Sequence, residues 1–477
     1  MKDTGNARPP LKVRQSARWL PADMDTPISL FMGMVGAGNG ILLESAEVDG
    51  RWGRYSILAC DMALFISCRE GRLALRVEDQ RFAPLGDLEG QPFVEGLRAL
   101  MRRLEITPPE NIAGLPPITR ALYGYLGFGM AGLFNAKLAS VMPPEEADCL
   151  LALPGTVLVF DHLYNRLCQI SLGEHRPLRS AHEAVESAAN GNSGTGLDPD
   201  AISAEPGEAG YKAYVERIRE MLRRGEAIQV VPSVRFSTPF AGNPFELYRR
   251  MRRFNASPYM FYMRFPDLTL FGSSPEVMVR CTEGRLQLSP IAGTRRRGRD
   301  DLEDARLAAE LRDDPKERAE HVMLVDLGRN DLGKVSRFGT VDVESFHTIE
   351  RYSHVMHIGL TVRGEIREDC DVLDAVSAVL PAGTLSGAPK IRACQLIGEL
   401  ENNKRGIYGG AIGYIDFTGN MDTCIAIRIA YKKNGQVFVR SGAGIVADSV
   451  PETEFEECIN KAKAVVNALK LAEEADL

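Results

Sequence analysis

The chain has 477 residues, of which 44% are hydrophobic and 25% are charged, and its formal net charge is −7. This composition is ordinary for a globular protein with one elaborate or two large domains, and the negative balance argues against a nucleic-acid partner. No apolar stretch is long enough to cross a bilayer and the N-terminus has no hydrophobic signal core, so we expect a cytoplasmic protein without a membrane partner.

Short motifs exclude several classes of site. The nine cysteines are scattered with no C-x-x-C pair, so neither zinc ligands nor a disulfide framework is predicted. There is no G-x-x-x-x-G-K-[ST] phosphate loop. A G-x-G-x-x-G string occurs at 127–132, but no helix with an acidic partner follows it, and we interpret it as a glycine-rich strand.

The first region, residues 1–186, alternates hydrophobic and polar residues in short segments, which is typical of β-strands. Glu70-Gly71 is expected to turn the chain between two of them. We therefore expect an antiparallel sheet with helices on it. The expected strands lie at 54–59, 63–68, 72–77, 156–160 and 166–172, and a helical pattern lies at 93–104.

Residues 187–210 are rich in Gly, Ser, Ala, Asp and Pro, which predicts a flexible linker or a surface excursion. The second region, 211–477, mixes helical and strand patterns, so the whole chain is predicted to be α+β. Its expected strands lie at 227–236 (with Pro232 at an edge or bulge), 259–265, 268–273, 276–281, 285–288, 411–417, 423–431 and 436–440, with a bend at 290–294 and a hairpin turn at Asn434-Gly435. Helices are expected near 214–222, after 314, at 372–380 and after 451. A further helical segment is expected after the loop at 381–390 and runs to about 401.

The helix after Asp314 carries acidic residues at helical spacing. Asp314 suits the N-cap and Pro315 the first helical position. Glu317, Glu320 and His321 then share one face. Two carboxylates one turn apart can hold a hard cation or exchange protons, although a solvated helical face has the same pattern.

A second carboxylate strip lies on the last helix, which begins with a capping-box pattern at 449–452. Hydrophobic residues at helical spacing predict that this helix packs on a core, while Glu454, Glu457 and Lys461 lie together on its other side. Magnesium needs only one or two carboxylates in addition to water and an anionic substrate. Glu320 and Glu457, one from each helix, would suffice.

Two glycine-rich loops, at 381–390 and 442–444, could bring backbone N–H groups close to an anion. Arg428 and Lys461 could add charge-assisted hydrogen bonds. Each loop taken alone could equally be a tight turn. Together with a cation site, the loops predict a small substrate that carries several negative charges.

These motifs closely resemble the chorismate-utilising enzymes and, within them, the anthranilate synthase component I family. The resemblance covers nearly the whole chain and implies two mostly antiparallel β-sheets packed as a sandwich flanked by helices. It rests on QVVPS at 229–233, SPYMF at 257–261, PIAGT at 290–294, AEHVMLVDLGRNDLGKV at 319–335, VMH at 355–357, GTLSGAPK at 383–390, GNMDTCIAIR at 419–428, GAGIVADSVPE at 442–452, LLESAE at 42–47, RWGRYS at 51–56 and VFDHLYNRL at 159–167.

The resemblance implies magnesium held by Glu320 and Glu457, bridging to the ring carboxylate of chorismate, with Glu317 and Glu454 around its water shell. It implies that His357 is the catalytic histidine, a candidate acid for departure of the ring hydroxyl or for the later elimination, and that His321 is structural. The remaining substrate positions that it implies are Thr384, Tyr414, Arg428, Gly442, Ala443, Gly444, Lys461, Ala292, Gly293 and Thr294.

Two positions distinguish among the relatives. Isochorismate and salicylate synthases place a water-activating lysine where Gln229 stands, and glutamine suits a site that receives ammonia instead. Aminodeoxychorismate synthases commonly place a lysine nucleophile where Ala292 stands. The expected reaction is therefore addition of ammonia at C2 of chorismate with loss of the C4 hydroxyl, followed by elimination of pyruvate to give anthranilate.

The resemblance also implies partners and regulation. Ammonia would come from a separate glutamine amidotransferase subunit in a hetero-oligomer. Tryptophan, as feedback inhibitor, would bind a pocket formed by Leu43, Glu44, Ser45, Pro258, Tyr259 and Met260. The alternatives are an aminodeoxychorismate synthase component I, which Ala292 disfavours, and a catalytically silent tryptophan-binding homologue, which the intact acidic and basic site residues disfavour.

Overall fold

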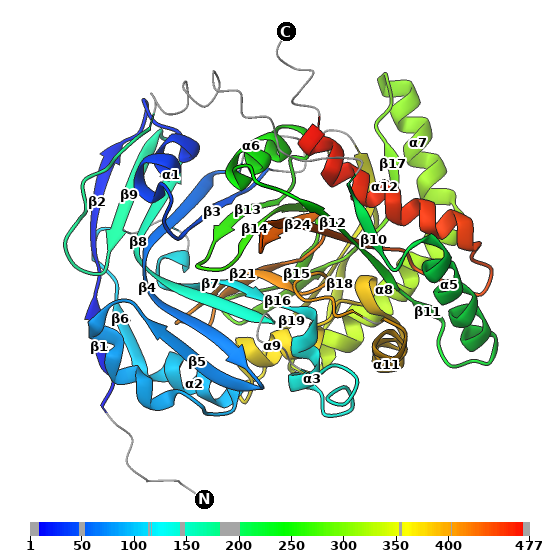
Figure 1. Ribbon diagram of the computed structural model, residues 1–477, viewed down its shortest axis with the longest axis horizontal. Helices are drawn as coiled ribbons and strands as arrows, with labels where there is room; N and C mark the ends of the chain where they lie inside the picture. Colours follow the sequence, from blue (N-terminus) through cyan, green and yellow to red (C-terminus); the bar gives the residue numbers. More distant parts are fainter. Residues whose placement is uncertain are drawn as a thin grey trace, which may run out of the picture.

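The computed structural model describes residues 9–46, 53–112, 115, 117–143, 148–181, 201–352, 355–401 and 403–470. The expected α+β class is confirmed, because a large antiparallel sheet carries helices along its outside (Figure 1). Its ladders link 20 strands in one network. Among the helices that the structure describes, none combines the length and hydrophobicity needed to span a bilayer.

The elements divide into an earlier and a later set along the chain. The earlier strands are β1 (Leu11–Arg14), β2 (Ser16–Pro21), β3 (Gly40–Glu44), β4 (Tyr55–Arg69), β5 (Arg72–Val77), β6 (Leu104–Thr107), β7 (Ala121–Leu126), β8 (Cys149–Asp161) and β9 (Arg166–Ser171), and the earlier helices are α1 (Pro27–Val35), α2 (Phe93–Arg103) and α3 (Ala131–Phe134).

The later strands are β10 (Ser203–Glu205), β11 (Gln229–Val230), β12 (Ser233–Pro239), β13 (Tyr259–Arg264), β14 (Thr269–Ser274), β15 (Val277–Thr282), β16 (Arg285–Ser289), β17 (Ile291–Arg296), β18 (Asp342–Arg351), β19 (Val355–Glu365), β20 (Gly387–Ala388), β21 (Ala411–Asp416), β22 (Met421–Ile425), β23 (Ile429–Lys433) and β24 (Gln436–Gly442). The later helices are α5 (Glu208–Arg223), α6 (Pro244–Phe254), α7 (Asp301–Asp313), α8 (Pro315–Gly333), α9 (Val372–Val379), α10 (Gly383–Ser386), α11 (Lys390–Leu400) and α12 (Pro451–Lys470).

Strands from both halves of the chain share the sheet. β3 pairs with β13, so that Glu44 lies opposite Met260, and β7 pairs with β21. Figure 1 shows the blue β3 beside the green β13. Buried side chains from both halves, such as Ile41 and Ile412, form one hydrophobic cluster. The domain limits at 1–186 and 211–477 remain a prediction, and the two regions are joined through backbone hydrogen bonds.

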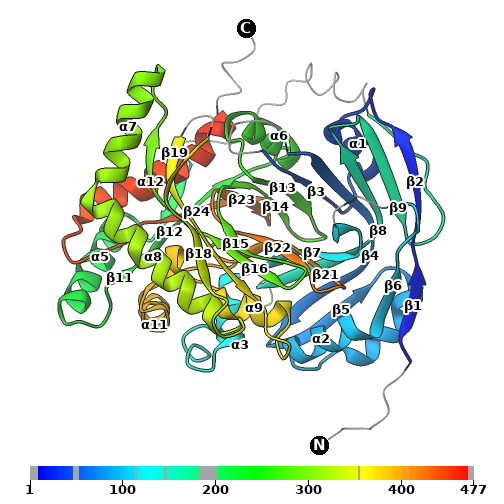
Figure 2. The same cartoon turned by 180° about the vertical axis from the view of Figure 1, so that it is seen from behind.

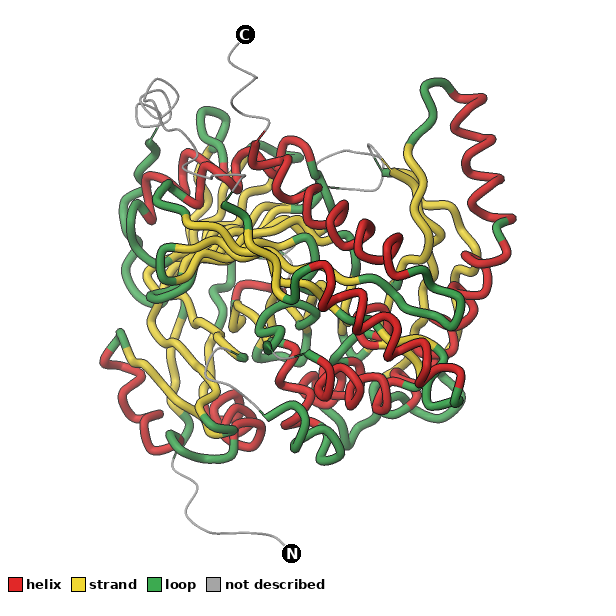
Figure 3. The backbone as a smooth tube through the Cα atoms, turned by 45° about the vertical axis from the view of Figure 1, so that its right-hand side comes forward, coloured by secondary structure: helices red, strands yellow, loops and turns green. Residues whose placement is uncertain are grey.

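Helices cover the later strands on their outer side. α8 packs on β17 and β19, and α12 packs on β24 and α5. Figure 2 shows α7 and α8 following one another past β18, and Figure 3 shows the helices gathered around the strands. The two helices that carry the predicted metal carboxylates, α8 and α12, therefore both lie against the same sheet.

Several local predictions are confirmed. Glu70 and Gly71 have φ of 49° and 75°, and Asn434 and Gly435 have φ of 50° and 72°, as the tight turns of hairpins require. α2 begins at Phe93 as predicted. Each of these features depends on a few neighbouring residues, which is why periodicity and turn chemistry predict them.

Two expected strands are broken by the tertiary structure. The segment 227–236 forms β11 and β12, because Pro232 has no N–H to continue the ladder. The segment 423–431 forms β22, which pairs with β15 and β21, and then β23, which pairs with β14 and β24. Arg428 lies at this crossover with φ of 52°.

Other expectations are corrected. The bend expected at 290–294 is strand β17, which pairs with β19 through a register shift at Gly293. α7 was not predicted at all. Within the expected linker, residues 187–200 lie outside the described residues, while Ser203–Glu205 pairs with β12 as β10.

Candidate active site

Glu320 of α8 and Glu457 of α12 lie in one electrostatic neighbourhood. The Asp314 side chain accepts hydrogen bonds from the amides of Lys316 and Glu317, which starts α8 at the predicted residue. Burial raises the pKa of Glu320, and repulsion from Glu317 and Glu457 raises this pKa further. A cation among these carboxylates would relieve that repulsion.

The Lys461 ammonium opposes this negative charge. It lies 2.6 Å from a Glu457 oxygen and donates to the Gly442 carbonyl oxygen at 3.1 Å. Glu454 lies one helical turn before Glu457 and is buried, and this burial raises the pKa of Glu454. In the described part of the chain, no three His, Cys, Asp or Glu side chains form a ready-made metal site. The Glu457 carboxylate is thus held in an ion pair with Lys461 in this structure.

His357 on β19 is held as a neutral imidazole. Its Nδ1 lies 2.9 Å from the Gly293 carbonyl oxygen and 3.0 Å from the Thr294 hydroxyl. Because a carbonyl oxygen can only accept, Nδ1 carries the proton. Burial lowers the pKa of His357 to about 4. The buried Nε2 has no hydrogen-bond partner among the described residues, so it presents a free lone pair.

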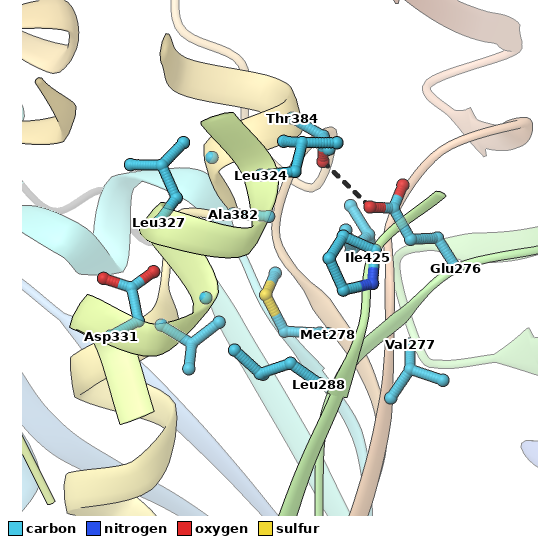
Figure 4. A pocket seen from close by; sticks show the side chains of 14 residues that line it. Glu276, Val277, Met278, Leu288, Leu324, Leu327, Asp331, Ala382, Thr384 and Ile425 are labelled. Carbon is cyan, nitrogen blue, oxygen red and sulfur yellow. Dashed lines mark hydrogen bonds between the residues drawn. The ribbon is translucent and has the colours of Figure 1, made fainter. Parts of the chain in front are cut away.

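Glu276, which sequence reasoning did not select, is a buried acid beside Thr384. The Thr384 hydroxyl donates to a Glu276 carboxyl oxygen at 3.1 Å (Figure 4). Burial raises the pKa of Glu276 to about 8, despite the opposing effect of the Arg428 charge. The side chain is therefore predominantly protonated at pH 7 and can donate a proton.

A cavity of about 30 Å³ lies between Glu276 and Asp331 and is lined mainly by hydrophobic side chains such as Leu288 and Leu327 (Figure 4). This volume holds a water molecule, whereas ligand pockets are usually some hundreds of Å³. The cavity therefore has room for water beside Glu276 and is too small for a small-molecule substrate.

Arg428 supplies positive charge at the same site. Burial lowers the pKa of its guanidinium, and the nearby Glu276 opposes that shift. Within the described residues, none forms a hydrogen bond or ion pair with this guanidinium. The Arg428 charge also contributes to lowering the pKa of His357. An arginine held in this way is suited to bind a carboxylate.

The glycine loop after β24 contacts Gln229. A Cβ added to Gly444 would lie 2.2 Å from the Gln229 side-chain nitrogen, so any larger residue would displace the end of this glutamine. Ala443 is fully buried. A Cβ on Gly442 would lie 3.2 Å from the Tyr408 hydroxyl. The tyrosine beside the glycine loop is thus Tyr408.

Tyr414 lies in a different environment from the one expected. Its cross-strand partner is Asp422, and the charges of Asp422 and Arg280 influence its pKa, which burial raises. Asp422 accepts from the Tyr259 hydroxyl at 2.6 Å, and Arg280 donates to Asp422 at 2.9 Å. Tyr414 therefore shares its neighbour Asp422 with Tyr259, a residue of the expected tryptophan pocket.

The β3–β13 ladder brings the remaining pocket residues together. Glu44 is buried and accepts from the Tyr248 hydroxyl and from Arg252, each at 2.6 Å. Met260 lies opposite Glu44. Ser45 follows β3 and is half-buried, and Leu43 and Pro258 flank the same ladder.

Comparison with known proteins decides the family, because the model of a family described as chorismate binding enzyme matches residues 79–467. The chain belongs to the chorismate-binding enzymes. Anthranilate synthase component 1 from Pseudomonas aeruginosa is 43% identical, with 95% of each chain covered. Anthranilate synthase component 1 from Aquifex aeolicus is 40% identical, with 96% of this chain and 94% of the relative covered. The chain is thus a member of the component I branch.

Solved structures agree with this assignment. Anthranilate synthase component I from Streptococcus pneumoniae has a TM-score of 0.69 at 33% identity and covers 87% of this chain and 92% of its own. The menaquinone-specific isochorismate synthase from Escherichia coli has a TM-score of 0.70 at 19% identity, and the match covers 97% of this chain and 96% of that enzyme. This match shows only that the fold is shared. The chorismate-binding fold thus accommodates more than one reaction, so the side chains must decide the chemistry.

Sequence reasoning missed two residues of this chorismate-binding enzyme. Glu276 stands in an apolar strand pattern as its one carboxylate, and an unpaired acid in a buried strand is a usable signal. Tyr408 precedes Gly409 and Gly410 and follows no periodic pattern, so only the contact with Gly442 distinguishes it.

Proposed function

We propose that the chain is the chorismate-converting subunit of an anthranilate synthase. It adds ammonia at C2 of chorismate as the C4 hydroxyl leaves, and then eliminates pyruvate to form anthranilate. The observation that carries the proposal is that the Arg428 charge acts on two groups at once. It lowers the pKa of the protonated acid Glu276 and the pKa of the neutral histidine His357, so all three side chains belong to one site. The names of the relatives support the same reaction.

Each group has a defined part in this proposal. Glu276 gives its proton to the leaving C4 hydroxyl, which departs as water while the amine bonds to C2. His357 then accepts the C2 proton at Nε2, and the C3–O bond breaks to release pyruvate. Arg428 and Tyr408 bind the enolpyruvyl carboxylate, and Gln229 directs the ammonia. A neutral His357 thus acts as a base, instead of as the acid expected from the sequence.

Magnesium is part of the proposal, and the clustered carboxylates fit it. Glu320 and Glu457 would hold the ion, with Glu317 and Glu454 near its water. When bound, the ion would neutralise the ring carboxylate of chorismate and orient it. Lys461 contacts Glu457 in this structure and would compete with the cation for that carboxylate.

The reaction is tested by anthranilate fluorescence from the purified protein with chorismate, an ammonium salt and magnesium at a pH no higher than about 8, where Glu276 still carries its proton. Anthranilate that appears only with magnesium is the expected result. Consumption of chorismate without anthranilate would show that Gln229 and Ala292 had been misinterpreted. No consumption would favour a silent homologue.

We further propose a separate glutamine amidotransferase subunit as the ammonia donor in a hetero-oligomer, which the component naming of the relatives supports. A cytoplasmic location fits the nine free cysteines. A two-layer sandwich remains the proposed sheet arrangement, supported by the hydrophobic cluster that strands of both halves share.

Ser45→Phe is expected to weaken tryptophan inhibition while preserving turnover. Ser45 directly follows Glu44, and its half-buried side chain lies against Gly53, whose amide donates to the Ser45 carbonyl oxygen at 2.7 Å, so a phenyl ring has no room there without displacing these neighbours. We expect the half-inhibitory tryptophan concentration to rise by about 10-fold or more. Ser45→Ala, which adds no bulk, is the control. Unchanged sensitivity in Ser45→Phe would reject the pocket.

Gly444→Ala is expected to lower kcat by about 10- to 100-fold, because the new methyl group displaces the Gln229 amide. Initial rates at saturating chorismate measure this effect. Gly333→Ala is the matched control, since a Cβ at Gly333 meets open space. Equal activity of the two variants would argue against a role for Gln229.

A further inference from the structure

Arg405 lies in the segment between α11 and β21, outside the groups that contact substrate in the proposed function. Its side chain is only 1% exposed. It donates to the carbonyl oxygen of Leu385 at 2.7 Å and to that of Val231 at 2.5 Å. One guanidinium therefore joins two backbone segments that are distant in sequence.

Both segments carry residues of the site. Leu385 directly follows Thr384, which holds Glu276, and Val231 lies two residues after Gln229. The segments also pair with each other, because β11 pairs with β20 and the Val231 amide donates to the Ser386 carbonyl oxygen at 3.0 Å. Arg405 thus donates hydrogen bonds to backbone carbonyl groups next to both strands of this short ladder.

Glu401 is the carboxylate that forms an ion pair with Arg405. It contacts the Arg405 guanidinium at 2.7 Å and is itself buried. The same carboxylate accepts from the amide and hydroxyl of Ser233 at 2.8 and 2.9 Å. A buried ion pair usually adds little net stability compared with an apolar pair of the same size, whereas its directional hydrogen bonds define a geometry.

We propose that Arg405 is a positioning residue that sets the separation between the ammonia-directing Gln229 and the acid pair Thr384–Glu276. This inference rests on the proposed function. Arg405 itself contacts neither substrate nor reacting atoms. It acts through two carbonyl hydrogen bonds that a lysine, with a single ammonium, cannot reproduce in the same fork.

The first test compares Arg405→Lys with the parent enzyme in ammonia-dependent turnover per folded protein. We expect kcat to fall by about 10- to 100-fold and KM for ammonia to rise, with KM for chorismate within about three-fold, because the displaced groups act on ammonia and the leaving hydroxyl. Arg392→Lys is the control. Arg392 lies on α11 and its guanidinium is 2.5 Å from a Glu226 carboxyl oxygen, but its side chain is 34% exposed, unlike that of Arg405.

A second variant separates positioning from folding. Arg405→Met with Glu401→Gln removes both members of this ion pair, so that neither is left buried without the other. The same loss of kcat is expected. If either variant has parental kcat per folded protein, the proposal is overturned. If the parent and Arg392→Lys themselves form no anthranilate, the proposed function has failed instead.

A mutant cycle supplies the readout that a merely structural role would not change. In a background with Gln229→Ala and Thr384→Ala, the kcat loss from Arg405→Lys is expected to shrink to within about two-fold, since the groups that Arg405 positions are absent. A loss that is the same in both backgrounds would show that Arg405 acts independently of these residues, and would overturn the proposal.

Discussion

Glu276→Gln is expected to reduce anthranilate formation from chorismate and ammonia by about 10²- to 10⁴-fold. Glutamine has the same shape and can still accept from the Thr384 hydroxyl, but it has no acidic proton for the leaving C4 hydroxyl. Chorismate binding should change little because Arg428 and the glycine loop remain. Initial rates over a range of chorismate concentrations separate kcat from KM. A variant that kept a tenth of the parental kcat would contradict the assignment of Glu276 as the acid.

The same residue predicts the alkaline side of the pH profile. The pKa of Glu276 is about 8, above its ordinary value, so the donating form is present below pH 8 and is lost as the pH rises through that value. The pKa of His357 is about 4, so its accepting form is lost only as the pH falls toward 4. At a fixed concentration of free ammonia, kcat/KM should decline above about pH 8. Glu276→Gln should remove that limb.

Glu320→Gln is expected to lower magnesium-dependent turnover by at least about 100-fold. The substitution removes one of the two proposed metal carboxylates. It also removes a charge that Glu317 and Glu457 repel, so the unfolding midpoint of the metal-free variant should equal or exceed that of the parent. Titration calorimetry with magnesium and a thermal melt without it measure the two effects.

Asp326→Asn is the matched control for this prediction. Asp326 lies on the same helix, loses the same charge, and is 73% exposed in a loose contact with Arg329 at 3.9 Å. It should keep parental turnover and magnesium affinity. If Glu320→Gln bound magnesium as tightly as this control, the proposed metal position would be wrong. The raised pKa of Glu320 also means that magnesium affinity should fall as the pH drops through that pKa.

The candidate site was predictable where its residues stand in local patterns. The acidic face of α8 follows from its cap at Asp314, and the strip on α12 follows from helical spacing. Neither pattern could reveal that burial makes Glu276 a protonated acid or that His357 is neutral, because both states depend on neighbours far along the chain. Tyr414 stands in an expected strand and Tyr408 follows no periodic pattern, so only the tertiary structure places Tyr408 beside the glycine loop.

By itself, the sequence determined the α+β class, the tight hairpin turns, the helix capped by Asp314 and the family. Each of these depends on short-range spacing or on an uninterrupted motif. Only the tertiary structure decided that the segment 423–431 divides into β22 and β23, since apolar residues stand on both sides of Arg428 and long-range pairing with different strands separates the two halves. That division places Arg428 at a crossover with φ of 52°, where its charge reaches Glu276 and His357. Long-range pairing thus selected the conformation of the residue on which the proposed chemistry depends.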